Sequence, residues 1–307
     1  MKMMMAGVVG LVLSLPVWAV DASILNLVMN DAKVVIGLNM DRVTASGIGK
    51  SLMEKADLDK GEFGKFIEAT GFDPRRDLRE ALVASKGEHE KQGSLVIGRG
   101  RFESGRIAAL AGVHGGSSQT YKGVTILGKD GGGAAFLGTT IVVAGSVEDV
   151  KAAIDRLQAG AKLAPALAAK IQSASGSYDA WMFSLTPPTM LGGGSKGGAA
   201  GQAELLQAIE SFSGGIRVAG ENVELLAEAN ARSEKDAGAL VDVFRFLVQM
   251  MAGNQPPDSP LAKMLDSMRT SVDGKTARFQ FTAPGAEILK LMDLPKKAGV
   301  RPVTAAR

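Results

Sequence analysis

The densest group of residues that could do chemistry is a charged segment in the first half of the chain. It reads Phe-Asp-Pro-Arg-Arg-Asp-Leu-Arg-Glu over residues 72–80. Arg75, Arg76 and Arg79 could hold an anionic partner, because guanidinium groups form paired hydrogen bonds with carboxylates and phosphates. The competing interpretation, which we favour, is a turn whose charges pair among themselves while Leu78 anchors it. The three arginines are therefore a candidate anion- or partner-binding site with an open alternative.

A second candidate is hydrophobic. Residues 239–251 are apolar nearly all round, with a thin polar stripe. A helix of this kind is usually buried in a core. The functional interpretation is a surface for a hydrophobic ligand or partner, on which Phe246, Met250 and Met251 offer large and adaptable side chains.

Three stretches imitate catalytic or binding motifs without completing them. Residues 44–51 resemble a phosphate-binding loop but begin with Thr44, where that loop needs glycine. Residues 193–197 fit the letters of a hydrolase nucleophile turn, yet both histidines precede Ser195 in the chain and no strand leads into it. Residues 57–68 approximate a calcium loop but lack its central oxygen ligand and its glycine. We therefore predict no catalytic residue, no metal site and no cofactor.

The composition limits the remaining classes. There is no cysteine, so disulfides, thiol nucleophiles and thiolate metal sites are excluded. The formal net charge is +3 with both signs mixed along the chain, which does not indicate a nucleic-acid partner. Hydrophobic residues make up 46% of 307 residues, enough for one large or two ordinary domains.

The N-terminus predicts export. Lys2 precedes an uncharged apolar run, and Val17 and Ala19 occupy the positions that signal peptidase reads. We expect residues 1–19 to be a signal peptide, with cleavage after Ala19 or Ala22, and a periplasmic or extracellular mature protein. The apolar run is shorter than the roughly 20 residues of a bilayer span, so no membrane span is expected in the mature chain.

The elements behind these residues alternate between hairpins and helices. Capping signals at Ser146 and Ser233 each begin a predicted helix. Each half of the chain reads as strand, helix, hairpin, helix, hairpin, helix, which suggests a duplication. We predict an α+β fold of two similar ferredoxin-like (split β-α-β) repeats over 23–165 and 175–295, with antiparallel sheets and helices packed on one face. A Gly-rich loop is expected at 191–201 and a disordered tail at 301–307.

Residues 69–80 and 138–146 resemble segments of uncharacterised exported bacterial proteins of similar size, which have a signal peptide and a repeated α+β body. The resemblance implies no activity. The leading hypothesis is a non-catalytic exported protein that binds an unknown protein or small molecule through its sheet faces or its Gly-rich loop. The alternatives are an enzyme with a carboxylate and arginine site that sequence spacing does not reveal, and an envelope scaffold or assembly factor.

Overall fold

The computed structural model describes residues 20–56, 58–87, 93–113, 115–187, 207–256 and 259–293. The predicted signal peptide at 1–19, the Gly-rich segment at 191–201 and the tail at 301–307 lie outside these residues. Within them, no helix has the length and apolar character needed to cross a bilayer.

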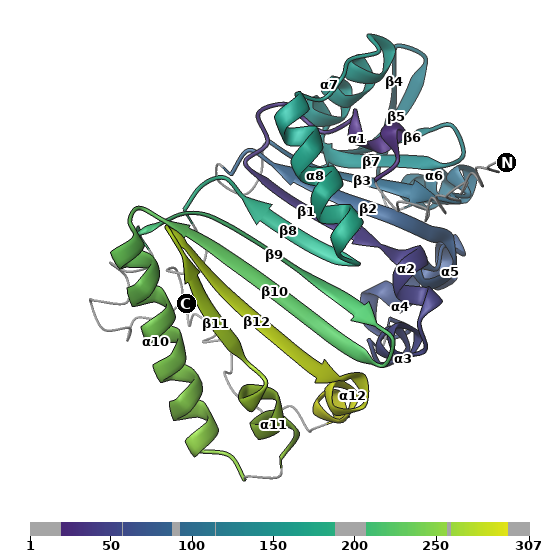
Figure 1. Cartoon of the computed structure of the whole chain (residues 1–307). Helices are drawn as coiled ribbons and strands as arrows, with labels where there is room; N and C mark the ends of the chain where they lie inside the picture. The colour runs from purple at the N-terminus through teal and green to yellow at the C-terminus, as the bar shows by residue number, and fades with distance from the viewer. Residues whose placement is uncertain are drawn as a thin grey trace, which may run out of the picture.

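In the described part of the chain, twelve antiparallel strands form one continuous sheet (Figure 1). The strands are β1 (Val34–Asn39), β2 (Leu78–Ser85), β3 (Ser94–Gly100), β4 (Ser117–Tyr121), β5 (Val124–Lys129), β6 (Gly132–Leu137), β7 (Ile141–Ser146), β8 (Ala180–Ser184), β9 (Ile209–Ala219), β10 (Asn222–Ala231), β11 (Arg269–Asp273) and β12 (Thr276–Pro284). Their order across the sheet is β11-β12-β10-β9-β8-β1-β2-β3-β7-β6-β5-β4. The antiparallel α+β class predicted from the sequence is confirmed.

The two halves share one sheet, whereas the prediction gave the two repeats separate antiparallel sheets. Strand β1 pairs with β2 on one side and with β8 on the other, so the halves join through main-chain hydrogen bonds. Outward from this central pair the order is the same in both halves, β1-β2-β3-β7-β6 and β8-β9-β10-β12-β11. In a split β-α-β unit the two strands that a helix connects are parallel, and a third strand lies between them. Here β1 and β2, which a helical segment connects, are direct antiparallel neighbours. The ferredoxin-like description therefore differs from the structure.

Helices lie on both faces of the sheet, which corrects the expectation of one covered face. They are α1 (Ala22–Leu25), α2 (Met40–Ala45), α3 (Gly47–Lys55), α4 (Gly61–Thr70), α5 (Pro74–Asp77), α6 (Ser104–Val113), α7 (Val147–Gln158), α8 (Pro165–Ser177), α10 (Glu234–Gly253), α11 (Pro260–Asp266) and α12 (Gly285–Asp293). Because strand residues alternate between faces, a sheet this wide leaves two apolar surfaces to be covered.

The front face, which carries Trp181 and Phe183, is turned toward the viewer in Figure 1. Helices α1, α7 and α8 cover its first half and enclose the larger core, which includes Ile154 and Ile171. Trp181 packs directly on the backbone of Gly37 in β1: a Cβ atom at Gly37 would lie 2.2 Å from the indole Cε2. The absent side chain at Gly37 is what lets the indole lie flat against the sheet.

The back face carries Ile36 and Phe279, and the described helices cover it at its two ends. Helix α10 packs over β11 and β12, where the rings of Phe244 and Phe279 lie 4.6 Å apart. At the other end, Phe102 contacts Phe136 of β6 with ring centroids 5.9 Å apart. Phe66 of α4 joins this aromatic group through Phe72, which follows the helix and stacks on Phe102. Helix α6 packs against α4.

Both predicted capping signals are present. The backbone N–H of Asp149 donates to Ser146 Oγ at 3.1 Å, and that of Asp236 donates to Ser233 Oγ at 3.1 Å. These bonds satisfy N–H groups that a helix start leaves without an intrahelical partner. The sequence also predicts a helix over residues 203–212, and this prediction is wrong for its last residues. Residues 209–212 belong to β9, because they pair with β10 and bury Ile209 in the second core.

Candidate functional site

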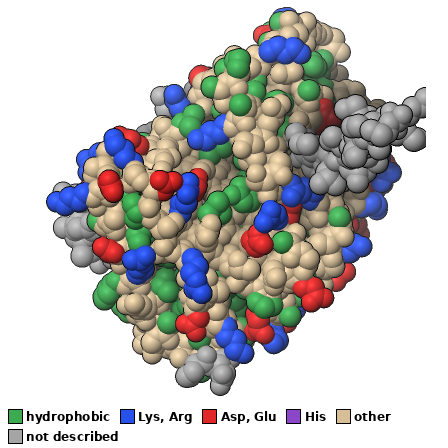
Figure 2. Space-filling model, in the orientation of Figure 1, with side chains coloured by type: hydrophobic (Ala, Val, Ile, Leu, Met, Phe, Trp, Pro, Cys, Tyr) green, Lys and Arg blue, Asp and Glu red, His purple; other side chains and the backbone are tan. Residues whose placement is uncertain are grey.

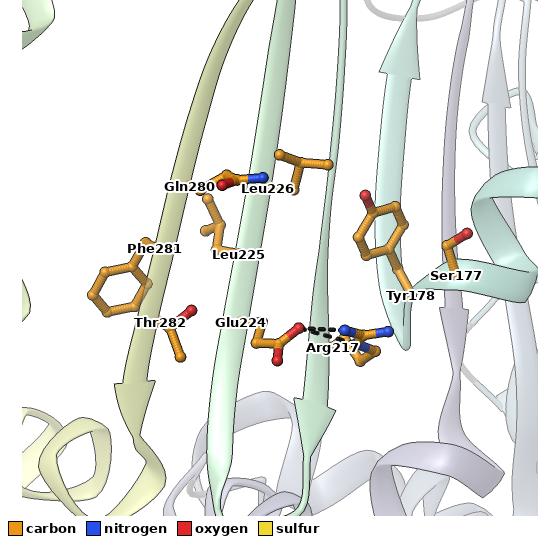
Figure 3. Close-up of a pocket in the computed structure, with 9 residues that line it drawn as sticks. All are labelled: Ser177, Tyr178, Arg217, Glu224, Leu225, Leu226, Gln280, Phe281 and Thr282. Carbon is orange, nitrogen blue, oxygen red and sulfur yellow. Dashed lines mark hydrogen bonds and ion pairs between the residues drawn. The ribbon is translucent and has the colours of Figure 1, made fainter. Parts of the chain in front are cut away.

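None of the described helices covers the front face of the second half of the sheet, which contains an open hollow of about 480 Å³. The hollow lies over β9, β10 and β12, beside the end of α8 (Figure 3). Its lining residues are Ser177, Tyr178, Arg217, Glu224, Leu225, Leu226, Gln280, Phe281 and Thr282.

Strand alternation decides which side chains face the hollow. Glu224 and Leu226 of β10 point to the same face, and their cross-strand partners are Arg217 and Gly215 of β9. The same register brings Thr282 and Gln280 of β12 to this face. Leu225 and Phe281 are one residue out of phase, so their side chains belong to the back face and they line the hollow with backbone.

Arg217 and Glu224 form the charged part of the hollow. Arg217 Nε donates to Glu224 Oε2 at 3.1 Å, and the two side chains are cross-strand neighbours (Figure 3). Because the guanidinium and the carboxylate neutralise each other, the hollow contains no net charge from this pair.

Tyr178 is the aromatic wall of the hollow. It follows the last turn of α8, where its N–H donates to the carbonyl of Ala174 at 3.0 Å. Its ring lies against the backbone of Gly215, at which a Cβ atom would come within 2.2 Å of Tyr178 Cγ. Burial raises the pKa of the Tyr178 hydroxyl, with the charge of Glu228 adding to the effect. Within the described residues, this hydroxyl has no hydrogen-bond partner, so it is available to a ligand.

A buried ion pair holds Tyr178 in place from behind. Arg42 Nε of α2 lies 2.7 Å from Asp179 Oδ1, and the other carboxylate oxygen of Asp179 accepts the N–H of Val218 at 2.7 Å. Arg42 also donates to the carbonyls of Ser175 and Tyr178. The first half of the chain therefore positions the end of α8 and the start of β8 against β9.

The face that bears the hollow is mixed in character (Figure 2). Hydrophobic side chains gather in its middle and are surrounded by lysines, arginines and acidic residues of both signs. Next to the hollow, Arg278 Nε donates to Glu228 Oε1 at 2.7 Å. The pairing of opposite charges leaves no strong field of one sign, which suits a neutral ligand better than an ion.

The arginines singled out in the sequence lie elsewhere, around α5. Arg75 donates to both carboxylate oxygens of Asp59 and of Asp73 at 2.6 to 3.1 Å. Arg76 forms a two-point contact with Asp77 at 2.9 and 2.6 Å. Pairing within the turn, the competing interpretation, holds for Arg76. Arg75 pairs within the turn with Asp73 and outside it with Asp59. Anion binding there stays a prediction, and an anion would have to displace these carboxylates.

Arg79 differs from its two neighbours. It is exposed on β2 and makes no ion pair with any described residue. The other candidate group, Phe246, Met250 and Met251, is exposed on the outer side of α10. The structure therefore does not bring the arginines and the apolar group into one site. In the regions that the structure describes, no three His, Cys, Asp or Glu residues are grouped so as to hold a metal ion.

Sequence reasoning missed the hollow. Tyr178, Arg217, Glu224, Gln280 and Thr282 come from three segments that only the sheet register brings together. The available signal was alternation: in β10 every second residue from Glu224 to Glu228 shares one face, and in β12 Arg278, Gln280 and Thr282 do the same.

Comparison with solved structures shows the fold. The chain is similar to TP0453 in crystal forms III and IV, with a TM-score of 0.52 and 10% sequence identity in each case. The alignment covers 89% of this chain and 98% or 97% of TP0453. No family model and no curated protein matches the sequence. The likeness extends over nearly the full length of both chains and concerns the fold alone.

Proposed function

We propose that this protein is exported and binds a neutral, polar ligand in the hollow over β9, β10 and β12. The observation that carries the proposal is the position of Tyr178. Its ring is packed against Gly215, and its hydroxyl forms no hydrogen bond with any described residue. The amide of Gln280 and the hydroxyl of Thr282 are further exposed polar groups of the hollow. An apolar wall with a few convergent polar groups is typical of a small-molecule site.

The chemistry of the hollow suggests the ligand class. Tyr178, Gln280 and Thr282 supply hydrogen-bond donors and acceptors, and none of them is charged near neutral pH. The charges of Arg217 and Glu224 neutralise each other. A ligand rich in hydroxyl or amide groups, with an apolar face to lie on Tyr178 and Leu226, fits this surface. A neutral sugar and a short peptide segment both have this character.

Binding is tested by native mass spectrometry of the mature protein purified from its own host, followed by calorimetric titration with neutral oligosaccharides and short uncharged peptides. We expect Tyr178→Ala and Gln280→Ala each to weaken binding by roughly tenfold, the loss of one hydrogen bond of about 1.4 kcal/mol. The matched control is Gln119→Ala on β4, an exposed glutamine at the far edge of the sheet. Equal affinity in all three variants contradicts the site.

Export is proposed on the signal sequence, and its test is separate. N-terminal sequencing of the mature protein is expected to begin at Val20 or Ser23, after cleavage at Ala19 or Ala22. A mature protein that begins at Met1 contradicts export by this route and leaves the ligand-binding proposal standing.

A further inference from the structure

The back face of the sheet contains an uncovered apolar surface, on the side opposite the hollow. Two cross-strand rows build it, and neither contains a charged residue. The first row is Val96, Val83, Ile36 and Met182, and the second is Ala81, Leu38, Ala180, Ile216 and Leu225. We call these nine residues the bare strip.

The bare strip is exposed where a sheet centre is ordinarily covered. Ile36 is 43% exposed, Val96 46% and Ile216 41%. Contiguous apolar surface of this kind marks an interaction site in soluble proteins. Burying such apolar side chains is favourable by about 25 cal/mol for each Å² of apolar surface that is removed from water.

Helices stand on both sides of the bare strip. Helix α10 packs on the same face through Phe244 and Phe279, and the α4 and α6 group packs there through Phe102 and Phe136. Between them lie β2, β1, β8 and β9. Four strands at about 4.8 Å span roughly 19 Å, and one helix is about 10 Å wide. A helix therefore fits beside α10 on this face, whereas a flat body would meet the flanking helices first.

Helix α10 has an apolar side that its own sheet does not use. Its buried side is Ala237, Leu240 and Val241. Arg245 Nε donates to Thr270 Oγ1 at 2.7 Å, so the Arg245 side of the helix faces the edge strand β11. At 100° per residue, the opposite side, with Val243 and Leu247, then faces the bare strip. Phe246, which is 63% exposed, lies about 100° around the helix from both Arg245 and Leu247. It therefore points, with Met250, away from the sheet that α10 covers.

We propose that two copies of this chain pair through their back faces, with α10 of each copy lying on the bare strip of the other. The contact is isologous, because the donor helix and the acceptor strip belong to the same side of one molecule. The bare strip contains no charged residue, so its nine residues bring no like charges together when two copies approach symmetrically. The two α10 helices would lie side by side between two sheets and complete the helix layer of each. The proposal does not depend on the hollow, which lies on the front face.

The oligomeric state tests this proposal with the mature protein itself. Sedimentation and light scattering at increasing concentration are expected to show a monomer–dimer equilibrium. Phe246→Glu and Ile36→Lys should each raise the dissociation constant at least tenfold. The matched control is Leu157→Glu, an exposed leucine of α7 on the front-face side. Circular dichroism and thermal unfolding establish that each variant is folded.

Cross-linking tests the geometry, since the chain has no native cysteine. A mixture of Phe246→Cys and Ile36→Cys proteins is expected to form a disulfide between the two variants under mild oxidation. A mixture of Phe246→Cys and Leu157→Cys should not form one. A protein that stays monomeric at every concentration overturns the proposal. So does a dimer that survives Phe246→Glu, or one that gives no selective cross-link.

Discussion

The guanidinium of Arg42 and the carboxylate of Asp179 meet at 2.7 Å, where the first half of the chain contacts the second. The side chain of Asp179 is only 5% exposed, and it also accepts the N–H of Val218 in β9. One carboxylate thus ties α2, β8 and β9 together. Removing one partner leaves the other charge buried and unpaired, which typically costs 3–5 kcal/mol.

We therefore expect Arg42→Met to lower the free energy of unfolding by about 3 kcal/mol. Urea unfolding followed by circular dichroism measures the change. A control pair is Arg217→Met, whose partner Glu224 lies at the surface and whose loss should cost under about 1 kcal/mol. If both variants lose the same free energy of unfolding, the ion pair of Arg42 and Asp179 contributes no more to stability than a surface pair.

Glycine substitutions test how Tyr178 is placed. Gly215→Ala is expected to destabilise the protein by about 1–3 kcal/mol, because the new Cβ atom meets the Tyr178 ring and forces it away. Gly238→Ala in α10 meets no atom within 4 Å and should stabilise the helix by up to about 1 kcal/mol. Thermal unfolding of both variants measures the two effects, which should have opposite signs. Gly215→Ala should also weaken ligand binding, whereas Gly238→Ala should not.

Helix starts give a third prediction. Ser146→Ala and Ser233→Ala each remove the acceptor of a helix-start N–H and should cost about 1 kcal/mol. Helix α8 begins without a side-chain cap, because Ala164 occupies that position. Ala164→Ser is therefore expected to stabilise the protein by about 0.5–1 kcal/mol. Chemical unfolding measures all three changes, and a loss on Ala164→Ser would contradict the capping argument.

The pairing around α5 predicts a dependence on pH. Hydrogen bonds from Arg75 lower the pKa of Asp73, and those from Arg76 lower the pKa of Asp77. A carboxyl with a lowered folded-state pKa stabilises the protein above its unfolded value of about 3.9, and this stabilisation is lost as pH falls through the folded value. We expect the variant with Arg75→Gln and Arg76→Gln to be less stable than the wild type near neutral pH.

This difference should shrink as the pH falls below about 4, since both carboxyls become protonated in either protein. Urea unfolding at a series of pH values measures it. A difference that stays constant down to the most acid pH would mean that the arginines act through packing, without the charges of Asp73 and Asp77.

Much of the fold could be predicted from local signals in the sequence. The long-range pairing of strands could not. The caps at Ser146 and Ser233 and the hairpin of β9 and β10 follow from residues close in sequence. The union of the halves depends on β1 pairing with β8, about 145 residues later, which no local pattern encodes. The hollow could not be predicted either, because Tyr178 meets Gly215 only when β8 pairs with β9, and the residues of this pair lie more than 25 positions apart in the sequence. Residues 209–212 were assigned to a helix since their strand character comes from β10.

Tyr178 gives the final prediction, since its hydroxyl reports on the hollow directly. Burial raises its pKa above the ordinary tyrosine value of about 10, because the charged phenolate is disfavoured away from water. The chain has two tyrosines, so Tyr178 is the remaining tyrosine that titrates in Tyr121→Phe. Ultraviolet absorbance against pH is expected to show one transition above the ordinary value, and a saturating ligand should move it higher still by excluding more water. A transition at the ordinary value would place the ring in solvent and remove it from the proposed site.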